Sequence, residues 1–356
     1  MSITDIASRR LQHQQLQKTA LKTPDSMVSF FGAMQAQDYA SSKWGIGARL
    51  PGCTHADVEN AIRQKKIIRT TVFRGTLHLV AAADVRWMLQ LAAPSVRTRG
   101  RSMQRKLGLD EPLFDRIKQL LIKLLEGGKQ LTRKEITAYL QANGINTDEN
   151  RMNHILYEAA ISGITCNGAL REKQFTYTLL DEWLPASDML DKETALQTLA
   201  RRFFTSHGPA TVADFAQWSG FPMKEAREGL ESARSALVAK QAGDVTWWMA
   251  PGRTRPVTTS ALLLPAFDEY FVGYKDRSTV IDMRHASKVM TLNGIFNPLM
   301  VRDGQVIGAW KRTIKKDTVS IVTAPFRSMK KAELKDFEPA ALRYAAFLGF
   351  TLQEFK

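Results

Sequence analysis

The sequence of 356 residues has few cysteines, no long apolar run and fewer acidic than basic residues. Its two cysteines, Cys53 and Cys166, are too few for a disulfide framework and form no CxxC pair, which excludes cysteine-ligated zinc and iron–sulfur clusters. No run approaches the ~18–20 uninterrupted apolar residues of a membrane-spanning helix, and the N-terminal segment lacks the apolar core of a secretory signal. We therefore expect a cytoplasmic protein that does not span a membrane.

The catalytic motifs that spacing alone reveals are also missing. The six histidines are scattered and form no HExxH pair, and the sequence contains no GxSxG, GxxxxGK[ST] or GxGxxG. We accordingly expect no metal and no cofactor. An enzyme with this sequence would have to use polar or carboxylate groups in a groove.

The basic residues that are present are unevenly distributed. Lys and Arg number 50 against 35 Asp and Glu, a formal charge of +15, and residues 1–109 alone hold 17 Lys and Arg against 6 Asp and Glu. A localised basic excess suits a polyanion, because each neutralised phosphate releases condensed counterions. Nucleic acid or an anionic membrane surface are thus the leading partners, and a solvated basic face is the alternative.

Hydrophobic periodicity predicts a mainly helical α+β protein. Helices are expected at 3–17, at 26–36 and from Thr54 onward, with an extended stretch at 44–50 and β-strands at 67–72 and 76–80. Three helices followed by a short hairpin is the order of a winged helix, a variant of the helix-turn-helix.

The same order returns twice. Helices are expected at 112–126, 132–143 and 151–162 before a hairpin at 164–180, and at 192–206, 211–218 and 222–235 before a hairpin at 237–250. We predict three tandem winged helix-turn-helix units at 1–109, 110–185 and 186–256, followed by a β-rich C-terminal region at 257–356 with a closing helix near 330–348. The first unit includes the basic segment 95–106, which is expected to be a linker.

One polar segment, FFGAMQAQDYA, places Gln35 and Gln37 on either side of a small residue, with Asp38 next. On an α-helix, residues i and i+2 lie ~200° apart, so the two amides converge only if the helix unwinds there. Periodicity alone favours a frayed, polar helix end.

Four sequence segments resemble those of a known protein family. MQAQDYASSKWGIGARL, TVFRGTLHLVAAADVRWML, LLPAFDEYFVGYKDRS and NPLMVRDGQVIGAWKR follow one another in the order found in the winged-helix DNA-binding family that includes AlkZ, a bacterial glycosylase that unhooks DNA interstrand crosslinks, and its relative YcaQ. The resemblance implies three winged-helix motifs around a concave basic surface for duplex DNA. Gln35-Ala36-Gln37 resembles the Gln-x-Gln signature of the AlkZ-like branch, whereas Asp38 lies one place beyond the aspartate of the YcaQ-like pattern.

The resemblance further implies a monofunctional DNA glycosylase of bacterial type. Such an enzyme hydrolyses the N-glycosidic bond of alkylated, cationic purines, and can unhook crosslinked strands. Gln35 and Gln37 would jointly hold the nucleophilic water, with the carbonyl accepting from the water and the NH₂ held by the backbone or by the other glutamine. Asp38 could stabilise charge or assist deprotonation. Lys43 is the one candidate for a rival Schiff-base mechanism, and a surface phosphate contact is the favoured role for it.

Double-stranded DNA is the expected partner, and a membrane is not; the protein is expected to act as a monomer. The candidates for phosphate contacts are basic residues of the first unit and of two hairpin-like segments: Lys43, Arg69, Arg74, Arg97, Arg99, Arg101, Arg105, Lys106, Arg253, Arg255, Lys311 and Arg312. For Arg74 a structural role is equally expected. Asp268 and Glu269, adjacent acids in an apolar run, are expected to pair with the basic units. The alternative function is a transcriptional regulator whose winged helices read DNA without chemistry.

Overall fold

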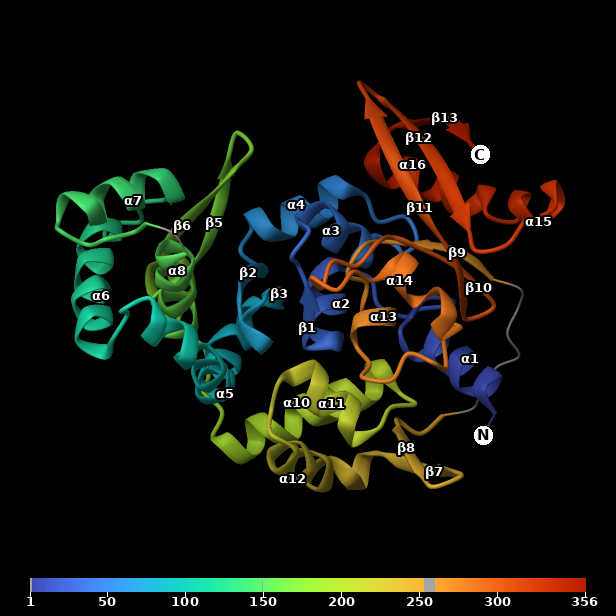
Figure 1. Ribbon diagram of the computed structural model, residues 1–356, viewed down its shortest axis with the longest axis horizontal. Helices are drawn as coiled ribbons and strands as arrows, with labels where there is room; N and C mark the ends of the chain where they lie inside the picture. The colour runs from blue at the N-terminus through green and yellow to red at the C-terminus, as the bar shows by residue number, and fades with distance from the viewer. Residues whose placement is uncertain (1, 149, 253–259) are drawn as a thin grey trace.

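The computed structural model describes residues 2–148, 150–252 and 260–356 (Figure 1). Its N-terminal part is built on a three-stranded antiparallel sheet of order β1-β3-β2. The elements of this part are α1 (Ile3–His13), α2 (Pro24–Phe31), β1 (Ala33–Gln35), α3 (Tyr39–Gly47), α4 (His55–Arg63), β2 (Ile67–Thr71), the short helix η1 (Phe73–Gly75), β3 (Leu77–Ala81), the short helix η2 (Ala82–Asp84) and α5 (Val85–Lys106).

Three expectations for this part are corrected. The helix expected at 26–36 ends at Phe31, because Gly32 adopts φ 83°, a conformation that only glycine takes readily, and β1 follows. The stretch expected to be extended at 44–50 lies mainly in α3, which begins where the Asp38 side chain accepts a hydrogen bond from the Ser41 N–H. The expected linker at 95–106 is the second half of the 22-residue helix α5.

The next two parts follow the predicted order of three helices and a hairpin. The first holds α6 (Glu111–Leu125), β4 (Leu131–Thr132), α7 (Arg133–Ala142), α8 (Arg151–Ile161), β5 (Thr165–Arg171), β6 (Gln174–Leu179) and α9 (Leu180–Trp183), and the second holds α10 (Lys192–His207), α11 (Val212–Ser219), α12 (Met223–Ala233), η3 (Arg234–Ala236), β7 (Val238–Ala242) and β8 (Val245–Met249). Side-chain oxygens cap α6, α7, α10 and α11 at their first turns, as the sequence pattern requires.

The C-terminal region is β-rich, as predicted. A five-stranded sheet of order β13-β12-β11-β10-β9 curls beside α16, and it forms a half-barrel against the N-terminal helices (Figure 1). The region comprises β9 (Ala261–Leu264), α13 (Glu269–Val272), η4 (Met283–His285), α14 (Ala286–Val289), β10 (Leu299–Arg302), β11 (Gln305–Lys315), β12 (Thr318–Pro325), α15 (Lys331–Lys335), α16 (Glu338–Leu348) and β13 (Thr351–Phe355).

The hydrophobic cores show how these parts are joined. One core combines α1–α4 with the C-terminal sheet, a second combines the β1–β3 sheet and α5 with α10–α12, and a third lies within α6–α8 and their neighbours. Trp44 Nε1 and Trp310 Nε1 donate to the β9 carbonyls of Leu263 and Leu264 at 2.7 and 2.8 Å across the first core. β1 and β3 lie where the first two cores meet, because each strand contributes alternate residues to both: Met34 and Leu79 to the first, Ala33 and Val80 to the second. The domain boundaries drawn from the sequence stay a prediction. In the described ranges, no helix is both long and apolar enough to cross a bilayer.

Candidate active site

The two glutamines singled out in the sequence lie at the end of β1, not on a helix. β1 pairs antiparallel with β3, and the ladder continues one residue further through the 2.7 Å bond from the Ala36 N–H to the Leu77 carbonyl oxygen. Alternate residues of an extended chain face the same side. Gln35 and Gln37 are therefore alternate residues at the end of this ladder and not residues on opposite faces of a helix.

The turn between β2 and β3 and the first residue of β3 hold the two amide oxygens. Gln35 Oε1 accepts a hydrogen bond from Arg74 Nη2 at 2.9 Å, and Gln37 Oε1 accepts one from the Leu77 N–H at 3.2 Å. Neither Nε2 donates a hydrogen bond to any residue that the structure describes. This reverses the expected arrangement, in which the NH₂ groups were anchored. Each amide still offers two N–H donors and one free lone pair.

Arg74 reaches Gln35 because its backbone is turned unusually. Its φ is 57°, in the left-handed region that non-glycine residues rarely adopt, and the next residue, Gly75, has φ 75°. Burial lowers the pKa of Arg74 to about 10, so the guanidinium stays charged at neutral pH. The connection thus places a cation directly on one of the two amides.

The peptide between the glutamines is clamped by a second arginine. Arg69 Nε and Nη2 donate to the Ala36 carbonyl oxygen at 3.2 and 3.0 Å, and Nη1 donates to Asn167 Oδ1 at 3.0 Å. Its guanidinium carbon lies 4.0 Å from the centre of the Phe175 ring. Burial lowers the pKa of Arg69 to about 10. Arg69 therefore fixes the backbone of the Gln-Ala-Gln segment.

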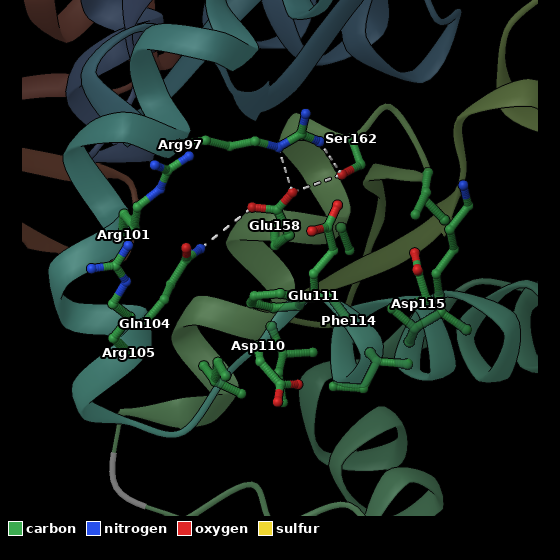
Figure 2. A pocket seen from close by; sticks show the side chains of 17 residues that line it. Arg97, Arg101, Gln104, Arg105, Asp110, Glu111, Phe114, Asp115, Glu158 and Ser162 are labelled. Atoms are coloured by element: carbon green, nitrogen blue, oxygen red, sulfur yellow. Dashed lines mark hydrogen bonds and ion pairs between the residues drawn. The ribbon is translucent and has the colours of Figure 1, made fainter.

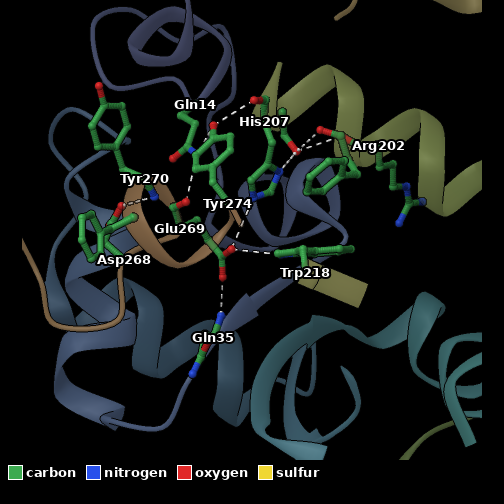
Figure 3. Close-up of polar contacts among 12 residues, drawn as sticks. Gln14, Gln35, Arg202, His207, Trp218, Asp268, Glu269, Tyr270 and Tyr274 are labelled. Carbon is green, nitrogen blue, oxygen red and sulfur yellow. Dashed lines mark hydrogen bonds and ion pairs between the residues drawn. The ribbon is translucent and has the colours of Figure 1, made fainter. Parts of the chain in front are cut away.

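Glu269 also holds the backbone of this segment, through the Gln35 N–H (Figure 3). Its Oε1 accepts from the Gln35 N–H at 2.7 Å, and its Oε2 accepts from Trp218 Nε1 at 3.0 Å and from His207 Nε2 at 3.3 Å. Glu269 and its two side-chain partners are at most 2% exposed. Burial acts to raise the pKa of Glu269, but the hydrogen bonds from His207 and Gln35 outweigh it and hold the pKa below its ordinary value. The Glu269 side chain is therefore expected to be an ionised carboxylate at neutral pH, and it contacts the last residue of β1.

Asp268, the neighbour of Glu269, forms a buried ion pair with the N-terminal part. Arg49 Nη1 and Nη2 each contact one Asp268 oxygen at 2.8 Å, and Nη2 also donates to Gln14 Oε1 at 2.7 Å. The expected pairing of this acidic segment with the basic first unit is confirmed for Asp268. Glu269 instead accepts the hydrogen bond from the Gln35 N–H.

Asp38 precedes α3 as its N-cap, and Lys43 lies within the helix. Asp38 Oδ1 accepts from the Ser41 N–H at 2.9 Å, so this carboxylate caps the helix. Lys43 is 4% exposed, forms an ion pair with Glu59 and contacts His55 Nε2 at 2.7 Å. Burial lowers its pKa. The expectation that Lys43 lies on the surface is therefore corrected, since its ammonium is used inside the protein.

With this geometry in place, comparison with known proteins is informative. The family model described as "DNA glycosylase AlkZ-like" matches residues 28–347. The chain belongs to the AlkZ-like DNA glycosylase family. It is similar to the "Interstrand DNA cross-link repair glycosylase" of Streptomyces sahachiroi, with 24% identity over 367 aligned positions that cover 96% of this chain and 95% of that protein. The solved structure "Streptomyces sahachiroi DNA glycosylase AlkZ" matches with a TM-score of 0.82 at 22% identity, over 99% of each chain.

These comparisons confirm the family that the sequence blocks indicate, and the structural likeness shows the AlkZ-like fold. They place the Gln-Ala-Gln segment inside the matched range. They do not bear on the role of single residues, so the catalytic role of Gln35, Gln37 and Asp38 stays a prediction for this member of the AlkZ-like family.

The residues predicted to contact DNA fall into two sets. Some cations are used within the protein: Lys43, Arg69 and Arg74 as above, Arg97 on Glu158, and Arg99 on the Gly220 carbonyl oxygen. Burial of Lys43 and Arg69, at 4% and 7% exposure, leaves little surface for a phosphate. Arg97 and Arg99 are exposed as well as partnered. The other exposed candidates are Arg101, Arg105, Lys106 and Lys311, Arg312 is half-buried over the Tyr344 ring, and Arg253 and Arg255 lie outside the described residues.

The exposed cations of α5 border a cavity of about 640 Å³ between α5, α6 and α8 (Figure 2). The side chains of Arg101 and Arg105 form no hydrogen bond or ion pair within the described ranges, whereas Arg97 Nε lies 2.7 Å from Glu158 Oε1. Acidic side chains, including Asp110 and Glu158, line the same cavity. Because the cavity carries both signs of charge, we take the exposed side chains of Arg101, Arg105 and Lys106 on α5, and not the cavity, as the basic surface.

Sequence reasoning missed the two buried side chains that hold Glu269, which in turn holds the Gln35 N–H. His207 and Trp218 lie far from Gln35 in the chain, and His207 was one of six scattered histidines. The detectable signal was Glu269 itself, a carboxylate in an apolar run, which must find partners when buried. Among the described residues, no group of three His, Cys, Asp or Glu side chains is arranged to hold a metal.

Proposed function

We propose that this chain is a monofunctional DNA glycosylase that hydrolyses the N-glycosidic bond of alkylated, cationic purines in duplex DNA, including purines tethered in an interstrand crosslink. The observation that carries the proposal is the pair of amides at the end of β1. Gln35 and Gln37 have their oxygens pinned by Arg74 and the Leu77 N–H, so their remaining donors and lone pairs are preorganised.

Weak polar groups suffice for this reaction. Alkylation of a ring nitrogen gives the purine a positive charge, so the base leaves without protonation by a strong acid. A water oxygen attacks C1′ of the sugar, the C1′–N bond breaks, and its electron pair neutralises the ring nitrogen. The water gives up one proton, to Asp38 or to bulk water. Gln35 and Gln37 hold the water in position, and oriented dipoles stabilise the charge that develops on the sugar.

The surrounding charges support this assignment. Arg69 and Arg74 keep the Gln-Ala-Gln segment in place, while the ionised Glu269 holds the Gln35 N–H. The carboxylate also offsets part of the positive charge of Arg69 and Arg74, which reduces their repulsion of a cationic substrate and of an oxocarbenium-like transition state. Three winged-helix motifs around a concave basic surface would hold the duplex, with Arg101, Arg105 and Lys106 on phosphates.

A lyase mechanism is not supported by the position of Lys43. A Schiff base needs a free, uncharged amine aimed at C1′, and the Lys43 ammonium is committed to Glu59 and His55. We expect borohydride to trap no covalent complex between the wild-type protein and damaged DNA. A trapped complex that disappears in Lys43→Ala would contradict the monofunctional mechanism.

The proposal is tested by incubating the monomeric protein with duplexes that carry one alkylated purine, one nitrogen-mustard crosslink or no lesion. We expect free base from the first duplex, separated strands from the second and no product from the third. A regulator without chemistry would bind all three and release nothing. If wild type and the Gln35→Ala/Gln37→Ala double variant act equally on every lesion, the glycosylase mechanism is refuted.

A further inference from the structure

A cavity of about 380 Å³ lies between Gln37 and the helices α7 and α8 of the next part of the chain. Two exposed side chains on the helical side line it: Arg133, the first residue of α7, and Asn153, in the first turn of α8. The volume is near the small end of the ~300–1,000 Å³ of sites that hold one small ligand. Groups on opposite walls of this cavity can therefore contact the same nucleotide.

The packing of α8 limits how this part of the chain can contact DNA. The order of α7, α8 and the β5–β6 hairpin is that of a winged helix, in which α8 takes the place of the recognition helix. However, α8 packs against α5, α6, β2 and β5, and Asn153 is the one exposed residue within its bounds, all of which the structure describes. A helix that is covered along its length cannot lie in a major groove. Its first turn, where Asn153 meets Arg133, is the part that DNA can reach.

Arg133 and Asn153 are joined so that they present hydrogen-bond donors. Arg133 Nη1 donates to Asn153 Oδ1 at 2.6 Å, which turns the amide oxygen toward the guanidinium. Asn153 Nδ2 donates one hydrogen to Asn150 Oδ1 at 3.2 Å and keeps its other hydrogen. The Arg133 side chain forms no ion pair and no other hydrogen bond with any residue that the structure describes. Its remaining N–H groups are therefore available beside the second amide hydrogen.

The charge around these donors favours an anion. Among the described residues on the cavity wall there is no Asp or Glu, and Arg133 is the one Lys or Arg. A guanidinium with neighbouring N–H groups is a typical partner of a phosphate, whose oxygens accept from several donors at once. The edge of a base presents donors as well as acceptors, so a set of donors alone suits phosphate better. Contacts to the DNA backbone set the register of a protein on the duplex.

We propose that Arg133 and Asn153 bind the phosphodiester that adjoins the damaged nucleotide, and that this contact places the sugar C1′ at Gln37. The inference rests on the proposed glycosylase function. Both are positioning residues, because they hold the backbone beside the reacting bond and take no part in breaking it. A displacement of about 1 Å in the reacting groups can reduce a rate by about 100-fold, so loss of this contact lowers the rate of base release more than it lowers affinity.

Neutral methylphosphonate linkages identify the phosphate that is bound. We would measure single-turnover base release and the dissociation constant for duplexes with one 7-methylguanine, in which one linkage is neutral: on the 5′ side of the lesion, on its 3′ side, or about six nucleotides away. On the unmodified duplex, Arg133→Ala should slow release at least ~10-fold and raise the dissociation constant at most about threefold, because other phosphates supply most of the affinity. Asn153→Ala should slow release about fivefold, as expected for one lost hydrogen bond.

The decisive result is the coupling between the variant and the linkage. In wild type, one of the two adjoining methylphosphonates should slow release about as much as Arg133→Ala does. In Arg133→Ala, the same linkage should have no further effect, whereas the distant linkage should change both proteins by the same factor. Losses that multiply independently at both adjoining linkages would overturn the proposal.

Lys134→Ala is the matched control. Lys134 is also an exposed cation in the first turn of α7, but it does not line the cavity. Both substitutions are at exposed positions, so both variants should fold like wild type, which thermal unfolding checks. We expect Lys134→Ala to release base within about twofold of the wild-type rate. If it slows release as much as Arg133→Ala does, the effect is one of general charge, and the assignment of Arg133 is refuted.

The dissociation constants separate failure of the site from failure of the function. If wild type releases no base, but Arg133→Ala and one adjoining methylphosphonate weaken duplex binding without adding to each other, the glycosylase function fails and the phosphate site stands. If wild type releases base and no linkage is coupled to Arg133, the phosphate site fails and the function stands.

Discussion

The buried carboxylate of Glu269 offers a sharp perturbation, because Glu269→Gln keeps its size and removes its charge. Three N–H groups converge on its two oxygens: the Gln35 backbone at 2.7 Å, Trp218 Nε1 at 3.0 Å and His207 Nε2 at 3.3 Å. A glutamine has one acceptor oxygen and an NH₂ donor. The substitution therefore puts the new NH₂ group next to N–H groups that need an acceptor.

The cost follows from which donors can adapt. His207 can accept by changing tautomer, since Ser206 Oγ lies 2.8 Å from its Nδ1. The Gln35 backbone and the Trp218 indole cannot. In either orientation of the new amide, one of these buried N–H groups loses its acceptor, at about 1–3 kcal/mol, and the other loses a charged acceptor. We expect the free energy of unfolding to fall by about 3 kcal/mol.

Activity should fall as well, because the Gln35 N–H is no longer fixed. A displacement of about 1 Å in a positioning group can reduce a rate by about 100-fold. We expect base release to slow 10- to 100-fold while affinity for undamaged duplex is unchanged. Glu228→Gln, at an exposed carboxylate of α12, is the control. Urea unfolding and single-turnover kinetics give both numbers. Unfolding energy within about 0.5 kcal/mol of wild type together with full activity would refute the role of Glu269.

Three further outcomes are expected. Burial lowers the pKa of His78 to about 4 in the folded protein, against 6.5 in the unfolded chain. Between these values the unfolded state binds more protons, so the free energy of unfolding falls by up to roughly 3 kcal/mol as the pH drops from about 6.5 to 4. Unfolding of His78→Gln measured at several pH values should lack this part of the pH dependence, and an unchanged pH dependence would contradict the prediction. Arg74→Lys cannot keep the same planar contact to Gln35, so it should slow base release at least ~10-fold without changing DNA affinity in a fluorescence titration; equal rates would argue against a positioning role. The triple change of Arg101, Arg105 and Lys106 to Ala should weaken duplex binding and reduce the salt slope of log Kd by about 2–3, whereas an unaltered slope would remove α5 from the DNA surface.

Local sequence signals predicted much of the fold. The order of helices and hairpins in residues 111–249 was recovered because apolar periodicity, capping residues and turn residues agree there. Sequence also predicted the buried Asp268 ion pair, though not that its partner would be Arg49. Prediction failed at Gly32, where one positive φ converts the expected helix into β1. It also failed at residues 95–106, where a basic stretch was taken for a linker although it continues the α5 helix.

The site was predicted only in part, since its contacts join distant parts of the chain. Gln35 and Gln37 were found from their spacing and from the family resemblance. The sequence could not show that Arg74 and Leu77 pin their oxygens, because that depends on the β2–β3 turn geometry. Nor could it show which cations are buried. Lys43 was predicted to lie on the surface and is buried, because the number of charged residues in a sequence does not show which of them are buried.

In the proposed reaction, Gln35 and Gln37 hold the water that cleaves the glycosidic bond. The most direct measurement is the single-turnover rate of base release from a duplex with one alkylated purine, with the dissociation constant for that duplex measured in parallel, for wild type, Gln35→Ala and Gln37→Ala. We predict that each variant slows release at least ~100-fold while its dissociation constant stays within about threefold of wild type. Rates equal to wild type, or losses in rate that match losses in binding, would contradict the account.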